Sequence, residues 1–157
     1  YRQHKLRFSK PLTESEPCPG RCADLLLQHF GNSGPPILLA GGFAVDGKPV
    51  QAQIDTLFTG TMLIYTDSVK KLDLKKQSKA HHKDQFPFTG GGVKMARGEA
   101  ESESFEDLPL LQNAPLYFAA PEMNQPDGLF DATVGIGLLQ GTAVTFNMHD
   151  RKLWIEK

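Results

Sequence analysis

The sequence predicts a mainly β domain with two or three short helices. Three observations support this class. Apolar runs are short and are repeatedly bounded by turn-forming residues, and 15 Gly and 11 Pro are spread over 157 residues. The dipeptide Asp46-Gly47 separates two such runs, where it is a strong signal for a β-hairpin. The length is sufficient for one domain with its own core.

Residues 1–36 are expected to form an N-terminal extension of loop and short helix. A first strand is compatible with residues 1–8, and residues 10–20 contain three prolines, which is typical of a loop. Residues 21–30 are expected to form a helix that ends at Gly31. Cys18 and Cys22 flank a Pro-Gly turn, and the sequence leaves open whether they form a disulfide or two free thiols.

Residues 37–157 are expected to form the main domain. Strands over residues 37–45 and 48–54 are joined by the Asp46-Gly47 turn, and Thr66 with Asp67 is expected to cap a short helix that reaches Leu72. The hydrophobic patterns predict further strands over residues 62–65, 95–105, 108–118, 142–148 and 152–156.

Composition and charge exclude several classes of partner. The formal net charge is -1 and 22% of residues are charged, so neither a nucleic acid nor an anionic membrane surface is indicated. The longest apolar run, residues 37–40, is far too short to span a bilayer. The sequence leaves the compartment open: it starts at Tyr1, and removal of a signal peptide would imply export to a periplasm or to the outside of the cell.

The segment Gln53-Ile54-Asp55-Thr56-Leu57-Phe58-Thr59-Gly60-Thr61 carries the strongest signal for function. An expected strand runs into a polar turn and delivers one carboxylate at its end. A second acidic turn follows at Asp131-Ala132-Thr133-Val134-Gly135-Ile136-Gly137, and a closing hairpin follows over residues 144–156. In this order and spacing, the three segments resemble the retropepsin-like, single-lobe aspartic proteases over roughly residues 37–156.

This resemblance implies a closed acid-protease β-barrel and an aspartic-type endopeptidase with a polypeptide substrate. In that family one chain supplies one Asp and a two-fold homodimer supplies the second, so that two close carboxylates share a proton. The resemblance makes Asp55 the catalytic carboxylate and Thr56 the residue that hydrogen-bonds across the dimer axis. It implies no metal and no organic cofactor. From the residues alone, an ordinary Asx turn is the favoured role of Asp55, and only the family pattern makes a catalytic-like site an equal alternative.

The glycine-rich stretch Phe88-Thr89-Gly90-Gly91-Gly92 lies where the family has a mobile flap over the substrate. The resemblance therefore assigns these five residues to substrate binding. A plain flexible hairpin is the alternative. No Lys-Ser/Thr pair follows the glycines, so they do not form a phosphate-binding loop.

One position departs from the family. Leu57 stands where the Asp-Thr/Ser-Gly triplet has glycine, and a positive φ at this position would cost a leucine on the order of 1–2 kcal/mol. This departure leaves a second hypothesis open, a non-catalytic relative that serves as a dimerisation or peptide-binding module. A third reading is a monomeric β-barrel that encloses a small apolar ligand.

The remaining chemically capable residues receive structural interpretations. Asp131 is expected to be a turn or capping residue rather than a second catalytic acid, and Trp154 is expected in the core. No Gly-x-Ser-x-Gly elbow is present, which argues against a serine hydrolase. The histidines lack the spacing of metal ligands and are expected in solvated positions: His4, His29, His81, His82 and His149.

Overall fold

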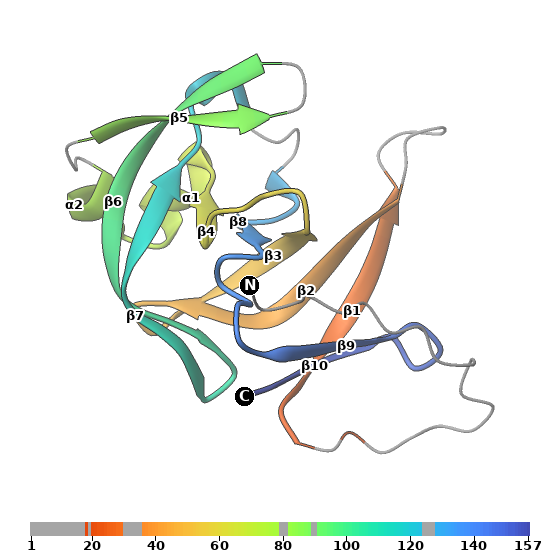
Figure 1. The fold of residues 1–157 in the computed structure, drawn as a ribbon. Coiled ribbons are helices and arrows are strands. Elements are labelled where there is room, and N and C mark those ends of the chain that lie inside the picture. Colours follow the sequence, from red (N-terminus) through yellow and green to blue (C-terminus); the bar gives the residue numbers. More distant parts are fainter. Residues whose placement is uncertain (1–17, 19, 30–35, 79–81, 89–90, 124–127) are drawn as a thin grey trace.

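The computed structural model describes residues 18, 20–29, 36–78, 82–88, 91–123 and 128–157 (Figure 1). Its strands are β1 Cys22–His29, β2 Pro36–Val45, β3 Lys48–Asp55, β4 Met62–Ile64, β5 His82–Phe88, β6 Gly91–Phe105, β7 Leu108–Phe118, β8 Ala132–Gly135, β9 Ala143–Asn147 and β10 Lys152–Glu156. Its short helices are α1 Thr66–Lys71, α2 Lys75–Ser78 and the 3-10 turn η1 Pro121–Met123. The mainly β class is thus confirmed.

The ten strands form one sheet in the order β5-β6-β7-β4-β8-β3-β2-β1-β10-β9. β2 also pairs with β6, which connects two strands that are far apart in this order. Most neighbours are antiparallel, but β3 pairs with β8 and β4 pairs with β7 in parallel. The closed barrel and the division of the chain at residue 36 remain predictions.

The hairpin predicted at Asp46-Gly47 is confirmed. Both residues have positive φ, 49° and 72°, as a two-residue type I′ connection between β2 and β3 requires. The Asp46 carboxylate accepts hydrogen bonds from the backbone N–H of Ser102 and from Nε2 of Gln77, both at 3.0 Å. The turn is therefore anchored to β6 and α2 as well as to its own strands.

The helix predicted over residues 21–30 is wrong, because Cys22–His29 form strand β1. Ala23 and Leu25 are buried while Asp24 between them is exposed, which is the alternation of a strand. β1 pairs with β10 through residues 22–24 and with β2 through residues 25–29. The three leucines at residues 25–27 show neither the helical nor the strand periodicity of apolar residues. The pairing of β1 with β10 and β2 therefore determined the structure.

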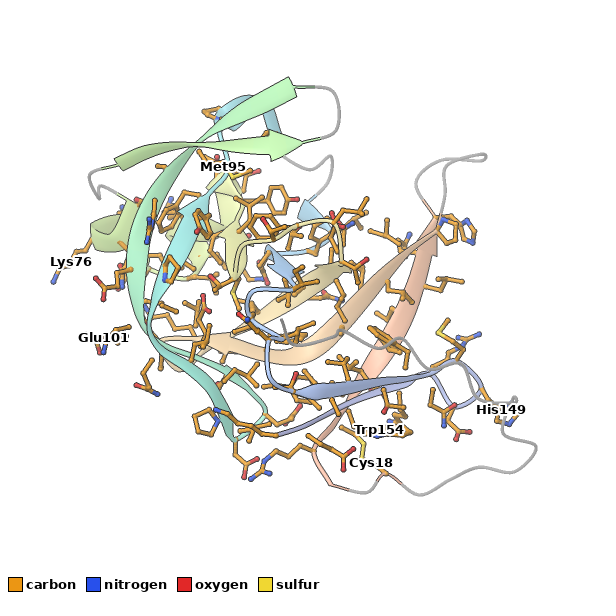
Figure 2. All side chains as sticks on the ribbon, viewed as in Figure 1. Cys18, Lys76, Met95, Glu101, His149 and Trp154 are labelled. Atoms are coloured by element: carbon orange, nitrogen blue, oxygen red, sulfur yellow. A yellow bond between two sulfur atoms is a disulfide. The ribbon has the colours of Figure 1, made fainter. Side chains whose placement is uncertain are left out.

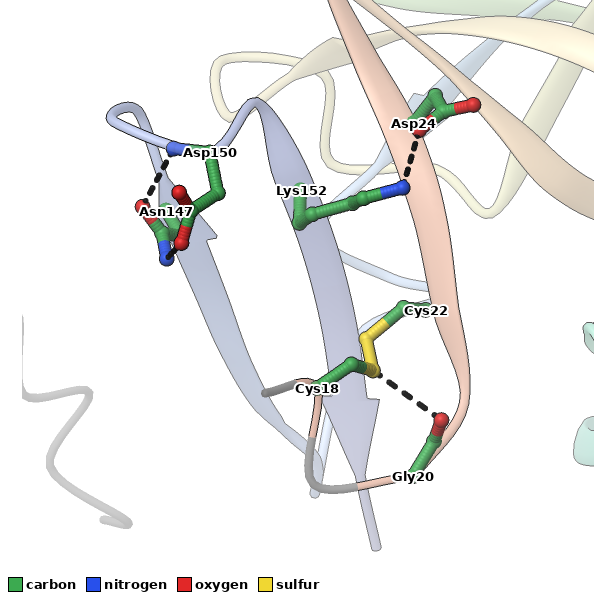
Figure 3. Close-up of a disulfide and its surroundings, with 7 residues drawn as sticks. All are labelled: Cys18, Gly20, Cys22, Asp24, Asn147, Asp150 and Lys152. Carbon is green, nitrogen blue, oxygen red and sulfur yellow. Dashed lines mark hydrogen bonds and ion pairs between the residues drawn. A yellow bond between two sulfur atoms is a disulfide. The ribbon is translucent and has the colours of Figure 1, made fainter. Parts of the chain in front are cut away.

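Cys18 and Cys22 form a disulfide with a Cα–Cα distance of 6.3 Å, which answers the question that the sequence left open (Figure 3). The bond closes a small loop at the start of β1. On the same strand Asp24 pairs with Lys152 of β10 (Figure 3). A covalent bond and an ion pair therefore both fix the part of β1 that contacts β10.

The predicted helix at residues 66–72 is confirmed as α1, but its predicted cap is wrong. Tyr65 is the N-cap residue, and no side chain caps the helix. The Thr66 hydroxyl donates to the Ala119 carbonyl at 3.3 Å instead. Tertiary contact with the end of β7 thus replaced the local cap that the sequence suggested.

Two hydrophobic clusters fill the interior (Figure 2). In the larger one, the rings of Phe43 and Phe105 meet edge to face with centroids 5.0 Å apart, which links β2 to β6. Trp154 is buried, as expected. The smaller cluster lies around the turn that follows β3 and extends to β6, where it includes Met95: Leu39, Phe58, Leu63, Tyr65, Met95, Tyr117, Ala119 and Phe130.

Glu103 of β6 is an ionisable side chain in the core, with 0% of its surface exposed. Neither carboxylate oxygen has a hydrogen-bond partner among the described residues. Burial raises the pKa of Glu103 to about 8, because the charged form loses its hydration. The negative charge of Asp46 adds to this shift. The Thr61 hydroxyl donates its hydrogen to the Pro115 carbonyl, so it makes no hydrogen bond to the Glu103 carboxylate. At neutral pH the side chain is therefore mainly protonated.

We expect the free energy of unfolding to fall as the pH rises, because Glu103 binds its proton more tightly in the folded chain. Its pKa is about 8 in the folded state against 4.5 normally, so the stabilisation is complete below about pH 4.5 and is lost as the pH passes 8. Glu103→Gln removes this titration and should flatten the pH dependence of the urea midpoint.

Glu101→Gln, at an exposed position of the same strand, is the matched control and should keep the wild-type pH dependence. If the urea midpoint of Glu103→Gln depends on pH as steeply as that of wild type, Glu103 is not the group whose raised pKa causes the pH dependence.

Candidate active site

Asp55 is the last residue of β3, at the point where the strand enters a tight turn. The backbone N–H of Phe58 donates to the Asp55 carbonyl at 3.2 Å and closes the turn. The backbone N–H of Leu57 donates to Oδ1 of Asp55 at 2.8 Å. The carboxylate is half-buried, and this bond holds it in one orientation. A side-chain oxygen of Asp that accepts the N–H two residues further on forms an Asx turn, which is the structural role that the residues alone suggested.

The turn after Asp55 is attached to the end of β8. Asp55 lies beside Gly135 in the parallel pairing of β3 with β8. Three consecutive N–H groups, those of Gly135, Ile136 and Gly137, donate to carbonyls of residues 58–61 at 2.9–3.0 Å. The two turns predicted from the sequence therefore do come together, and each fixes the backbone of the other.

Glycine is required at Gly135 because backbone atoms approach too closely for a side chain. A Cβ there would lie 2.3 Å from the Gly60 carbonyl oxygen and 2.4 Å from that of Phe58. A Cβ at Gly137 would lie 2.7 Å from the carbonyl oxygens of Thr59 and Gly60. The two glycines are thus a packing requirement of the candidate site.

Thr56 and Leu57, the central residues of the turn, both face solvent. Thr56 is exposed, and its hydroxyl makes no hydrogen bond within the described part of the chain. Leu57 has 83% of its surface exposed. The described non-glycine residues with positive φ are Asp46, Asp73, Glu106, Asn113 and Arg151, so Leu57 does not bear the expected strain.

Asp131 has the structural role that was expected. It is buried and accepts hydrogen bonds from the Gln51 N–H, from Oγ of Ser68 and, at 2.8 Å, from Nζ of Lys71. The Asp131 N–H donates to the Gln51 carbonyl, so Asp131 lies level with Gln51, four residues before Asp55 along β3. At the spacing of a β-strand, the two aspartates are therefore roughly 13 Å apart. Asp131 is therefore not a partner for Asp55 within one chain.

The residues that hold Asp131 could not be found from the sequence, because Ser68 and Lys71 are about sixty positions away. The sequence also missed a buried pair of hydroxyls, Tyr65 and Thr133, whose oxygens are 2.9 Å apart. This pair joins the residue after β4 to β8, the strand that ends at Gly135. A contact between two residues so far apart in the sequence leaves no periodic pattern from which it could be predicted.

The hairpin predicted around Gly90 is present, because β5 pairs with β6 up to Phe88 and Gly91, and Gly92 pairs with Pro87 (Figure 1). Thr89 and Gly90 lie outside the described residues. The use of the hairpin as a flap remains a prediction.

Within the described residues, no group of three or more His, Cys, Asp or Glu side chains has the arrangement of a metal site. His29 lies on β1 and His149 in the turn between β9 and β10, both exposed. In the same residues no helix has the length and apolar character needed to cross a membrane.

Neither a family model nor a curated protein matches the sequence. Among solved structures, the chain is similar to a retropepsin-like aspartic protease from Rickettsia conorii, with a TM-score of 0.52 and 14% identity. The match covers 85% of this chain and 90% of that one. The fold is retropepsin-like. At this identity the likeness concerns the fold, and the roles of Asp55 and Thr56 remain proposals.

We expect Gly135→Ala to destabilise the fold by about 1–3 kcal/mol or more, since its methyl group would overlap two carbonyl oxygens of the Asp55 turn. Urea unfolding monitored by Trp154 fluorescence measures the effect. Gly41→Ala is the matched control, because no atom lies within 4 Å of its added Cβ. Equal stability of the two variants would contradict the packing requirement.

Proposed function

We propose that the chain is an aspartic-type endopeptidase that acts as a homodimer on polypeptide substrates. The observation that carries the proposal is the Asp55 carboxylate, held at 2.8 Å by the Leu57 N–H at the end of β3 in a retropepsin-like fold. The half-buried position leaves the carboxylate within reach of a ligand.

In the proposed reaction the two Asp55 carboxylates of a dimer share one proton. The ionised carboxylate takes a proton from water as the water attacks the scissile carbonyl carbon, and the protonated one donates its proton to the carbonyl oxygen. Proton transfer to the amide nitrogen then breaks the C–N bond. Because one of the two carboxylates must hold a proton, activity should favour acidic pH.

The proposed dimer assigns a role to two further groups. The exposed Thr56 hydroxyl, one residue from Asp55, is available to hydrogen-bond across the two-fold axis. The hairpin at Phe88, Thr89 and Gly90-Gly91-Gly92 would close over the bound peptide. Both assignments depend on a second copy that brings the second carboxylate.

A second candidate function is a non-catalytic dimerisation or peptide-binding module. The observation that favours it is Leu57, whose apolar side chain is 83% exposed beside Asp55. Such a side chain offers an apolar contact at the position where substrate would enter. The two candidates therefore differ in whether bound peptide is cut.

We expect Asp55→Asn to lower cleavage by about 10²–10⁴-fold or more, because the amide neither takes up nor shares the catalytic proton. Asn keeps the size and the oxygen that accepts the Leu57 N–H, so the fold should persist. Mass spectrometry of a peptide library, incubated from about pH 3 to pH 7, measures the loss.

Asp67→Asn, on the exposed face of α1, is the matched control and should cut like wild type. Cleavage retained in Asp55→Asn would refute the mechanism. A folded, dimeric wild type that binds peptides without cutting them would favour the binding module.

We expect Thr56→Val to weaken the dimer by about tenfold or more, because two symmetric hydroxyl bonds are lost at the axis. Thr56→Ser retains the hydroxyl and should retain wild-type affinity. Sedimentation equilibrium of the three proteins measures the monomer–dimer constant. Equal monomer–dimer constants for Thr56→Val and Thr56→Ser would refute the proposed role of the Thr56 hydroxyl.

A further inference from the structure

We infer that Leu57 makes the site selective for peptides with small residues, Gly or Ala, on both sides of the scissile bond. This inference rests on the proposed function of the Asp55 site. It concerns a position at which the chain departs from the glycine of the resembling family.

The first step is proximity to the reacting group. The Leu57 nitrogen is 2.8 Å from Oδ1 of Asp55, so its side chain starts within a few ångströms of the carboxylate. A scissile carbonyl that reaches hydrogen-bond distance of Asp55 must therefore pass beside Leu57. The residues next to that carbonyl are the ones that meet its isobutyl group.

The second step is the direction of the side chain. Phe58, the next residue, is buried with 2% of its surface exposed, and its ring packs on that of Tyr117 with centroids 5.9 Å apart. Leu57, in contrast, is 83% exposed. The turn thus sends Phe58 into the core and leaves the Leu57 side chain in solvent, one residue beyond Thr56 and two beyond Asp55.

The third step is rigidity. The 58–61 segment accepts three backbone hydrogen bonds from Gly135, Ile136 and Gly137, and the close approach at Gly135 leaves no room between the two segments. The buried Phe58 also blocks any retreat of Leu57 into the core. Leu57 can therefore change rotamer but cannot withdraw its backbone from the site.

Together these observations place a fixed apolar obstacle beside the carboxylate. A homodimer carries one Leu57 from each copy, so both sides of the scissile bond are restricted. A bulky substrate side chain would compete with the isobutyl group for the same space, and small residues would not. In an apolar site, one methylene group more or less discriminates between substrates by about 10- to 200-fold.

The test compares octapeptides with Ala-Ala or Phe-Phe at the centre of an otherwise identical sequence. Wild type should cut the Ala-Ala peptide with at least about tenfold higher kcat/KM. Leu57→Ala and Leu57→Gly should raise kcat/KM for the Phe-Phe peptide at least about tenfold relative to kcat/KM for the Ala-Ala peptide. Leu57→Met keeps the bulk and should keep the wild-type preference.

Leu27→Ala is the matched control, since Leu27 is an exposed leucine on β1, outside the Asp55 turn. This variant should retain the wild-type ratio of kcat/KM between the Ala-Ala and Phe-Phe peptides. A ratio that is unchanged by Leu57→Ala, or a Phe-Phe peptide that is cut more slowly after this change, would overturn the inference.

Binding separates this inference from the proposed activity. The same two peptides, labelled for fluorescence anisotropy, are titrated into Asp55→Asn and into Asp55→Asn with Leu57→Ala. An affinity for the Phe-Phe peptide that rises about tenfold in the double variant supports the role of Leu57. This holds even if no variant cuts peptides, because the absence of cleavage would refute only the proposed endopeptidase activity. Equal affinities, or no measurable binding of either peptide, would overturn the inference.

Discussion

The parallel pairing of β3 with β8 is the constraint on which the candidate site depends. It brings the turn after Asp55 against residues 135–137, far apart in the sequence, and three backbone hydrogen bonds of 2.9–3.0 Å join them. Because the contact is made by backbone atoms, it excludes side chains at Gly135 and Gly137. The position of the carboxylate is therefore set by main-chain geometry.

The same strand pair holds a carboxylate at each end, and their surroundings differ. Asp131 is buried among an N–H, a hydroxyl and an ammonium group, so its acceptor capacity is used inside the fold. Asp55 receives the Leu57 N–H on one oxygen and remains half-buried. A carboxylate that is oriented but still accessible is suited to chemistry, whereas a fully bonded one is suited to structure.

Local chemistry decided which features were predictable from the sequence. Asp46-Gly47 was predicted correctly because both residues tolerate the positive φ of a type I′ turn. Residues 22–29 were predicted wrongly because three consecutive leucines carry no period, and pairing with β2 and β10 determined the strand. The sequence located Asp55, but the absence of strain at Leu57 depends on a backbone angle that only the structure supplies.

The position of β1 has a consequence for the order of folding. β1 lies near the start of the described chain and pairs through residues 22–24 with β10, which is close to Lys157. Contacts between such distant segments carry the largest loop-closure entropy, so they form late. During synthesis, that edge of β1 stays unpaired until β9 and β10 have left the ribosome, and an unpaired strand edge is prone to wrong pairing in the meantime. The disulfide between Cys18 and Cys22 lies beside this edge, and because its two cysteines are only four residues apart, closing it does not require β10.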